Sequence, residues 1–400
     1  MRTRLDQQPS VLHVAQTLLP PSETFIQQRL VGARFRPTAV AWRRDPGGLP
    51  VPCPHRILGG RARARLPAPL RSAALHAETF ALLARMHPSV VHAHFGPAGL
   101  RVDRECRLLA IPLVVSFYGF DVGTLPRDSR IVRRYRELFN EAAAVTAEGP
   151  ALARKLLDLG APARTVKLLP LGLPEWALAP PHRAVAWDSK PLRLLQVARF
   201  AEKKGIDTTL RALALARRRG AQAELVLAGG GPLEAPLRSL IEELRLSDAV
   251  SLPGFVPHDE LPRLLSEAHL FVQPSRTASD GDTEGGHPTT LLEAQAQEVP
   301  VLGTRHADIP MAVQHGTIGW LVAEDDHEAL AEGIVALDRD RARLRRMGEA
   351  ARSWVLRRHH PERLLKLRER IYRNALRTYA SRRSPLAKRV RGAVRDWLAA

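Results

Sequence analysis

The stretch LQVARFAEKKGIDTTLRAL, residues 195–213, runs from an apolar segment with strand character into the opening turns of a helix. Arg199 and Lys204 stand five residues apart at this junction. The forked guanidinium of an arginine and the point charge of a lysine both suit phosphate oxygens. Solvated charges at the start of a surface helix are the alternative, which a chain with 60 lysines and arginines satisfies easily. The junction therefore predicts a strand–helix unit with two candidate phosphate-binding cations.

A second stretch, TEGGHPTTLLEAQA at residues 283–296, places a glycine-rich turn before another helix. Glycines let backbone amides come close to a ligand, and the first turn of a helix offers N–H groups without an intrahelical partner. The carboxylates on either side of the turn accept hydrogen bonds from sugar hydroxyls. An acidic loop before an ordinary amphipathic helix is the alternative. Together with the two cations, the turn predicts a nucleotide-sugar site that includes Glu284, Gly285, Gly286, Thr289, Thr290 and Glu293.

Around these stretches, short apolar runs alternate with amphipathic helical segments, a pattern typical of parallel sheets flanked by helices. A chain of 400 residues exceeds one ordinary core, so two domains are expected. Residues 43–69 are rich in proline, glycine and arginine and predict an irregular surface segment. We expect an N-terminal domain at 1–175, a proline-rich linker at 176–190, a C-terminal domain at 191–355, and a crossover helix with a basic tail at 356–400. The expected strands are 10–15, 38–42, 90–92, 113–117, 143–146 and 166–169, then 192–197, 224–228, 250–252, 270–273, 299–303 and 319–322.

Composition limits the class of protein. Two cysteines without metal-type spacing, no signal-peptide core and no apolar run of about 18 residues predict a cytoplasmic protein without disulfides, transmembrane helices or a bound metal. The net charge of +19 attracts phosphates, nucleic acid or anionic lipid, unless it reflects genomic composition. Aromatic residues are only 5% of the chain and do not interleave with the basic ones, so we expect no nucleic-acid partner and keep a nucleic-acid-binding protein as an alternative of another class.

Two motifs give the chain a family resemblance. VARFAEKKG at 197–205 resembles the signature GRLxxEKG, and LLEAQAQEVPVLGTRHADIP at 291–310 is similar to the same family throughout. The family is that of the family-four retaining glycosyltransferases of the GT-B fold, which implies two facing doubly wound, Rossmann-like α/β domains and a C-terminal crossover helix. Fixed cations beside the donor diphosphate would stabilise the charge that develops on the leaving group.

The resemblance also implies roles for single residues. Arg199 and Lys204 would act on the donor diphosphate. Glu293 would hold the ribose hydroxyls, and Glu284 would lie near the donor sugar as a third catalytic residue. Eight residues separate the two glutamates, one more than the family's usual seven.

Two glycine-containing segments resemble parts of the family's nucleotide site. LAGGGP at 227–232 resembles the GxGP turn beside the nucleotide, with Gly229 and Gly231 against the donor. Because it lacks the spacing of a dinucleotide fingerprint, NAD is disfavoured. PGFVPHDEL at 253–261 resembles the segment whose backbone near Val256 meets the base.

The first half resembles the family more loosely. The string LLPPSETFIQQRL at 18–30 resembles the acceptor-side loop of transferases that build colanic-acid-like exopolysaccharides, with a plain helix N-cap as the alternative. Where the family often has a histidine facing the donor, SFYGFDV has a tyrosine, whose hydroxyl donates a hydrogen bond but carries no imidazolium charge. DGD at 280–282 is interpreted as a polar loop, not a metal site. The contacts expected with acceptor or donor sugar are Ser22, Glu23, Thr24, His94, Tyr118 and Asp121.

The resemblance implies transfer of a sugar, with retention, from a nucleotide-diphosphate donor, expected to be a UDP-sugar, to a hydroxyl acceptor. We expect no cofactor and no metal, and an acceptor that is a lipid-linked saccharide of a surface polysaccharide. Decoration of a small natural product such as an aminocyclitol is the alternative. The basic tail SRRSPLAKRVRGAVRDWLAA predicts a helix on the anionic inner face of the membrane, with a solvated tail as the alternative.

Overall fold

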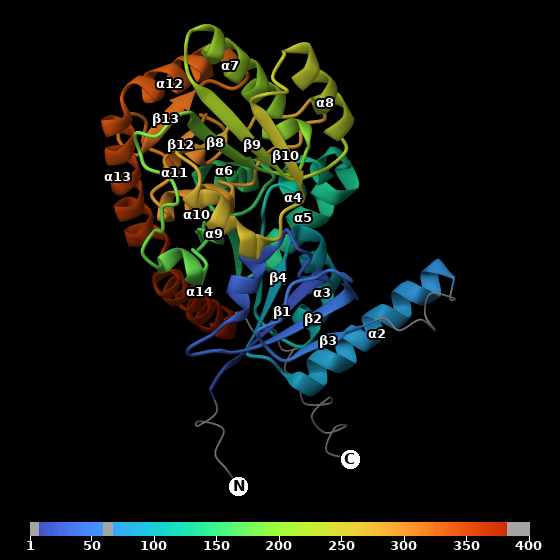
Figure 1. The fold of residues 1–400 in the computed structure, drawn as a ribbon. Coiled ribbons are helices and arrows are strands. Elements are labelled where there is room, and N and C mark those ends of the chain that lie inside the picture. The colour runs from blue at the N-terminus through green and yellow to red at the C-terminus, as the bar shows by residue number, and fades with distance from the viewer. Residues whose placement is uncertain (1–7, 59–66, 382–400) are drawn as a thin grey trace. The chain divides into compact units, whose positions relative to one another are not determined.

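The computed structural model describes residues 8–58 and 67–381, which form two compact units (Figure 1). Unit 1 joins the chain up to Pro170 with a C-terminal helix from Glu362, and unit 2 comprises Leu171–Pro361. The predicted membrane-binding tail at 381–400 lies outside the described residues except for Ser381, which ends the C-terminal helix. Within the described ranges, every helix is too short or too polar to cross a bilayer.

Unit 1 is built on a seven-stranded sheet of order β3-β2-β1-β4-β5-β6-β7, in which all paired strands are parallel. Its strands are β1 Ser10–Leu18, β2 Arg36–Arg44, β3 His55–Ile57, β4 Val90–His94, β5 Leu113–Ser116, β6 Ala144–Ala147 and β7 Val166–Leu168. Its helices are α1 Thr24–Gln27, η1 Gln28–Leu30, α2 Ala68–Met86, α3 Gly96–Leu108, α4 Phe120–Gly123, η3 Leu125–Arg127, α5 Ser129–Glu141, α6 Pro150–Asp158 and α14 Pro361–Ser381.

Apolar residues fill both faces of this sheet because successive side chains of a strand point to opposite sides. On one face, Leu12 belongs to a buried cluster with residues of α3 and α5, such as Leu138. On the other, Val11 and Val114 pack in a cluster with Tyr372 of α14. The C-terminal helix therefore completes the core of unit 1.

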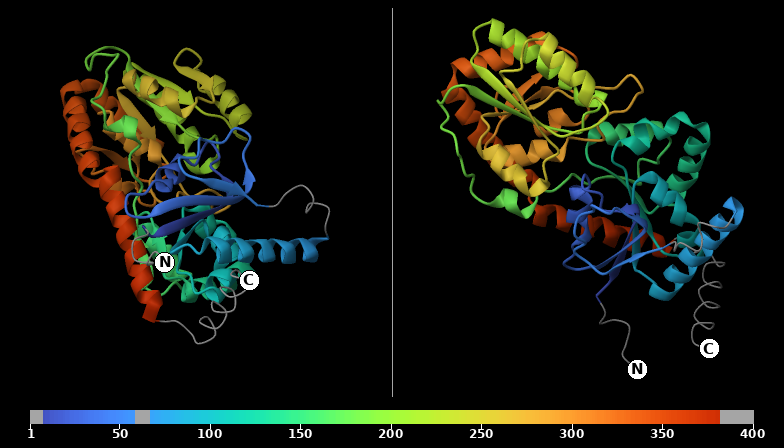
Figure 2. Two further views of the ribbon diagram at one scale, coloured as in Figure 1. Left: turned by 90° about the horizontal axis from the view of Figure 1, so that it is seen from below. Right: turned by 45° about the vertical axis from the view of Figure 1, so that its right-hand side comes forward.

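Unit 2 is built on a six-stranded parallel sheet of order β10-β9-β8-β11-β12-β13. Its strands are β8 Leu192–Val197, β9 Ala223–Ala228, β10 Val250–Gly254, β11 Leu270–Gln273, β12 Val301–Thr304 and β13 Gly319–Val322. Its helices are η4 Glu175–Leu178, η5 Glu202–Lys204, α7 Ile206–Arg218, α8 Glu234–Glu243, η6 His258–Glu260, α9 Leu261–Ser266, α10 Thr289–Ala296, α11 Ile309–Ala312, α12 His327–Arg339 and α13 Arg341–His359. Figure 2 shows helices on both sides of each sheet.

These two doubly wound parallel sheets confirm the fold class that the sequence predicts. In both sheets the strand order reverses beside the first strand, between β1 and β4 in unit 1 and between β8 and β11 in unit 2. Ligands of such sheets bind beyond the carboxyl ends of the strands at this switch point. Within each unit, the loops after these strands are therefore where function is expected.

Two segments differ from the expectation. The region 43–69, predicted to be irregular, contains β3, a short exposed edge strand that pairs with β2, and the start of α2. The segment 176–190, predicted as a linker, belongs to unit 2, where the Ala184 N–H donates to the Ser266 carbonyl oxygen and the Gln297 side chain donates to the Ala177 carbonyl oxygen. These bonds satisfy polar groups that a free linker would leave to water.

Candidate functional site

The two motif stretches of unit 2 meet at its switch point. Lys204 ends the short η5 turn after β8, and Glu284 lies in the loop after β11. The Lys204 Nζ donates to the Glu284 Oε1 at 2.6 Å, and the Ser275 hydroxyl donates to the same oxygen at 2.9 Å. One predicted cation and one predicted carboxylate are thus in direct contact although they lie 80 positions apart in the sequence.

The Glu284 carboxylate is held in its charged form. Burial alone would raise its pKa, but the charges of Lys204 and Lys203 and the hydrogen bonds from Lys204 and Ser275 outweigh burial and lower the pKa. A charged, mostly buried carboxylate next to an ammonium group can accept a hydrogen bond from a sugar hydroxyl while the ammonium group binds an anion.

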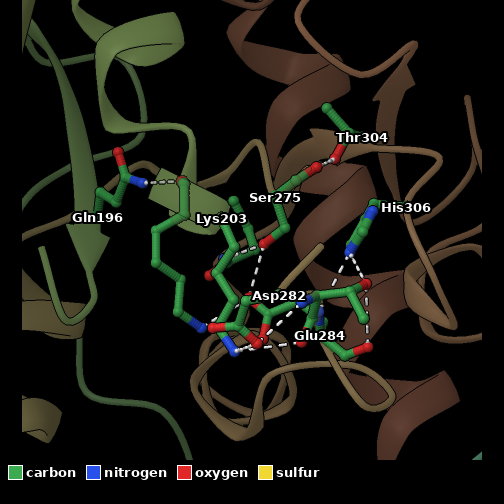
Figure 3. A network of polar contacts seen from close by, with 10 residues as sticks. Gln196, Lys203, Ser275, Asp282, Glu284, Thr304 and His306 are labelled. Carbon is green, nitrogen blue, oxygen red and sulfur yellow. Dashed lines mark hydrogen bonds and ion pairs between the residues drawn. The ribbon is translucent and has the colours of Figure 1, made fainter. Parts of the chain in front are cut away.

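Each residue of the η5 turn binds the loop that leads to Glu284. Glu202 accepts hydrogen bonds from the Ser279 N–H and hydroxyl at 2.8 and 2.6 Å. Lys203 Nζ donates to Asp282 Oδ1 at 3.0 Å and to the Thr283 carbonyl oxygen at 3.1 Å. Figure 3 shows Lys203 reaching toward Asp282 beside Glu284. The polar loop predicted at 280–282 therefore serves as an attachment point for Lys203.

His306, which follows β12, supports the same loop from the other side. Its Nε2 accepts the Glu284 N–H at 3.2 Å and lies 2.9 Å from the Thr283 hydroxyl, while its Nδ1 lies 2.8 Å from Glu324 Oε1 (Figure 3). Because Nε2 accepts the Glu284 N–H, a ring proton belongs on Nδ1, where Glu324 accepts it. Sequence reasoning missed His306 and Ser275, although both are polar residues at strand carboxyl ends, which is the signal that would have marked them.

The glycine turn after β9 lies against the loop that contains Arg199. A Cβ on Gly229 would come within 1.9 Å of the Ala198 carbonyl oxygen, and a Cβ on Gly231 within 2.8 Å of the Phe200 carbonyl oxygen. Both glycines have positive φ, 143° and 150°. Arg199 itself is exposed and, within the described residues, its guanidinium makes no hydrogen bond or ion pair. Its guanidinium is therefore available to an anion beside the glycine turn.

Helix α10 begins at Thr289, and the predicted donor-side residues of this stretch lie in the turn before it and along its first two turns. Gly285 and Gly286 are buried in the turn before it, and Thr289 and Thr290 are half-buried at its start. Glu293 is only 1% exposed, and its Oε1 lies 2.9 Å from the Nε2 of His258, two residues after the half-buried Val256. The predicted base segment and the predicted ribose carboxylate are thus joined by His258, which sequence reasoning did not single out.

In unit 1, the string after β1 forms the short helix α1 at the switch point of that sheet. Ser22 is exposed, Thr24 is buried, and Glu23 occupies the N-cap position without a side-chain cap hydrogen bond. Glu23 Oε2 is buried without a partner among the described residues. Burial, with a smaller contribution from Asp45, raises the pKa of Glu23 to about 7. This carboxyl is thus placed to exchange a proton near neutral pH.

The other predicted contacts of unit 1 are internal. The Tyr118 hydroxyl is bound by Arg29 at 3.0 Å and by His94 Nδ1 at 2.7 Å, and the side chain is buried. Asp121 accepts hydrogen bonds from the N–H groups of Gly96, Tyr118 and Gly119, which closes the turn after β5. Burial nevertheless raises the pKa of Asp121, to about 6, and these backbone bonds oppose the rise. Both side chains therefore shape the switch-point loops from inside.

Three buried histidines gather on β1 and β4, namely His13, His92 and His94. One ring nitrogen of each lies within 4.8 Å of a ring nitrogen of the other two. His92 binds the Tyr372 hydroxyl of α14 and the Ser116 hydroxyl, both at 2.7 Å, and His13 Nδ1 lies 3.0 Å from His94 Nε2. Burial and the nearby arginines 29 and 368 lower the pKa of all three rings. Neutral rings bonded to hydroxyls, with two cations nearby, favour a hydrogen-bond network over a cation site.

Family models match both halves of the chain. The model described as "Glycosyl transferases group 1" matches residues 181–354, and the model "Glycosyltransferase Family 4" matches residues 27–175. The first falls within unit 2 and carries the Lys204–Glu284 contact.

Three curated relatives are glycosyltransferases by description. WcaL of Salmonella typhimurium, described as a colanic acid biosynthesis glycosyltransferase, is 34% identical over 62% of this chain and 61% of its own length. The amylovoran biosynthesis glycosyltransferase AmsK of Erwinia amylovora is 35% identical over 66% of this chain and 64% of its own length. A GDP-mannose-dependent phosphatidylinositol monomannoside mannosyltransferase of Mycobacterium tuberculosis is 32% identical over 65% of this chain and 69% of its own length. The match thus spans less than two thirds of the first two relatives.

Among solved structures, the HepE protein of Anabaena in complex with UDP superposes with a TM-score of 0.74. The superposition covers 90% of this chain and 98% of HepE at 17% sequence identity, so the two share a fold.

Proposed function

Because this chain belongs to the family-four glycosyltransferases of the GT-B fold, we propose that it moves a sugar from a nucleotide-diphosphate donor to a hydroxyl acceptor with retention of configuration. The observation that carries this proposal is the contact between Lys204 and Glu284 at the carboxyl edge of the unit 2 sheet. It puts a cation for the diphosphate next to a charged carboxylate for a sugar hydroxyl, which is the pair of groups that such a donor requires.

In the proposed reaction, the bond between the anomeric carbon and the diphosphate breaks while the acceptor hydroxyl forms the new glycosidic bond. The negative charge that grows on the leaving diphosphate is met by Arg199 and Lys204, so both cations bind the transition state more strongly than the ground state. Glu284 orients the donor sugar, and Glu293 holds the ribose. In front-face attack, the leaving phosphate takes the proton of the acceptor hydroxyl.

We propose a UDP-sugar as donor, since the structural neighbour HepE was solved with UDP. The mannosyltransferase relative is named for GDP-mannose, so both bases belong in the test. We propose a lipid-linked saccharide of an exopolysaccharide as acceptor, because WcaL and AmsK are named for colanic acid and amylovoran biosynthesis. The enzyme would then work in the cytoplasm at the inner face of the membrane, without metal or other cofactor.

A panel of UDP- and GDP-sugars, each incubated with the protein, tests the reaction. We expect one donor to release its nucleotide diphosphate, slowly with water and faster with a lipid extract of polysaccharide-producing cells. NMR of the freed or transferred sugar at early times is expected to give the anomer of the donor. Inversion would contradict retention alone, whereas no release from any donor, with or without extract, would contradict the transferase function.

A further inference from the structure

The carboxylate of Glu293 has one satisfied oxygen and one unsatisfied oxygen. Oε1 lies 2.9 Å from the Nε2 of His258, whereas Oε2 is buried and has no hydrogen-bond partner among the described residues. Buried polar atoms are nearly always paired, so an unpaired buried carboxylate oxygen points to a ligand that completes it. The free oxygen is therefore the one that has an acceptor site left for a ligand.

His258 is the group that fixes which oxygen is free. It begins the η6 turn after β10, and its side chain is 29% exposed, so it reaches Glu293 from the rim of the site. The Trp176 ring of η4 lies edge-on to the imidazole, with 6.0 Å between ring centroids. The charged groups that act on the imidazole are Glu293 of α10 and Asp259 of its own turn. The hydrogen bond that His258 donates to Glu293 is the main reason that the pKa of His258 is raised.

We propose that His258 is a positioning residue for donor recognition: it binds one oxygen of Glu293 so that the other oxygen accepts the ribose hydroxyls of the nucleotide. This inference rests on the proposed function and adds to it a residue to which the motif at 253–261 assigns no role. Without a hydrogen-bond donor at position 258, the Glu293 carboxylate would be free to rotate or to take up a proton in its buried position. In either case its hydrogen bond to the ribose would weaken while the diphosphate contacts of Lys204 remained.

The ribose hydroxyl itself supplies the readout. UDP and 2′-deoxy-UDP, and likewise GDP and 2′-deoxy-GDP, differ only in that hydroxyl, so the ratio of their dissociation constants isolates the ribose contact. Calorimetric titration of the full-length wild type is expected to give a ratio of about tenfold, the usual effect of losing one hydrogen bond to a charged group. In His258→Ala, we expect weaker binding of UDP and a ratio close to one.

Two variants separate this role from a loss of folding. His258→Gln keeps an amide that can donate to Glu293, and it is expected to restore most of the ratio. His182→Ala removes an exposed histidine of unit 2 that has no described partner, and it should bind both nucleotides as the wild type does. A partly unfolded variant would lose active protein, which lowers the binding stoichiometry and leaves the ratio unchanged.

The outcomes are distinguishable. A wild-type ratio that persists in His258→Ala, or a wild-type ratio near one, overturns the role of His258 while nucleotide binding itself still supports the proposed function. If neither UDP nor GDP binds the wild type at millimolar concentration, the proposed function fails and the role of His258 fails with it.

Discussion

Removing the Lys204 ammonium while keeping the bulk of its side chain, as in Lys204→Met, isolates the contact on which the site depends. Its partner charge on Glu284 is only 10% exposed and Lys204 is 16% exposed, so water screens the pair weakly. Two unit charges about 4 Å apart attract by about 4 kcal/mol at an effective dielectric constant near 20. Lost hydration of both ions offsets much of this, and Ser275 and Lys203 still stabilise Glu284 after the substitution. We expect Lys204→Met to destabilise unit 2 by about 2 kcal/mol, with a coupling to Glu284→Gln of about 1–2 kcal/mol.

Urea unfolding of the four proteins of this double-mutant cycle measures the coupling. Four of the six tryptophans, Trp176, Trp187, Trp320 and Trp354, belong to unit 2, so tryptophan fluorescence reports mainly on that unit even if the two units unfold separately. Arg211→Met, which removes an exposed cation without a described partner, is the matched control and should stay within about 0.5 kcal/mol of the wild type.

The pH dependence of the coupling follows from the lowered pKa of Glu284. A carboxyl whose pKa is lower in the folded protein contributes stability above its unfolded value, and this contribution is lost as the pH falls through the folded pKa. The coupling is therefore expected at pH 7 and should vanish well below the ordinary glutamate value of 4.5. A coupling near zero at pH 7, or one that survives in acid, would refute the charged contact.

Three further predictions concern single positions. Glu23→Gln should stabilise the protein by about 1–3 kcal/mol at pH 8 and have little effect at pH 4.5. The reason is that the pKa of Glu23 is raised to about 7, so the wild type loses stability as the pH rises through that value. Equal effects at both pH values in urea titrations would contradict this. Tyr372→Phe should lower the free energy of unfolding by about 1–2 kcal/mol in the same assay, because it removes the hydroxyl bound to His92. Tyr135→Phe removes a buried hydroxyl without a described partner and should be neutral or stabilising. Equal losses of stability in the two variants would refute the histidine network. Gly205→Ala should cost more than about 3 kcal/mol because its Cβ would lie 2.0 Å from the Pro274 carbonyl oxygen. Gly220 also has a positive φ, but a Cβ there would meet open space, so Gly220→Ala should cost about 1 kcal/mol. The reverse order of melting temperatures would show that the close approach at Gly205 is wrong.

Much of unit 2 was predictable because its signals are local. The predicted strand 270–273 coincides with β11 Leu270–Gln273, since a short apolar run bounded by polar residues has few other structures available. The start of α10 at Thr289 follows from the proline and glycines before it. The meeting of Lys204 with Glu284 follows from the family resemblance and from the rule that loops after the two switch-point strands lie together.

The rest depends on contacts between distant residues. β3 is three exposed residues, His55–Ile57, without apolar alternation, and it exists because β2 offers a free edge. The contact of His258 with Glu293 spans 35 residues, and that of Lys203 with Asp282 spans 79. The histidine network requires the register that sets His13 opposite His92, which only the strand order of the folded sheet determines. None of these pairings has a periodicity or spacing that a sequence displays.

Calorimetric titration of UDP and GDP into the wild type and Lys204→Ala tests the central claim most directly, with Arg211→Ala as the matched control and duplex DNA as a competing ligand. The account predicts that one nucleotide diphosphate binds the wild type and the control equally, and that it binds Lys204→Ala about 10- to 100-fold more weakly, the usual effect of losing a hydrogen bond between charged groups. Equal affinity for Lys204→Ala, or binding of DNA and of neither nucleotide at millimolar concentration, would contradict it.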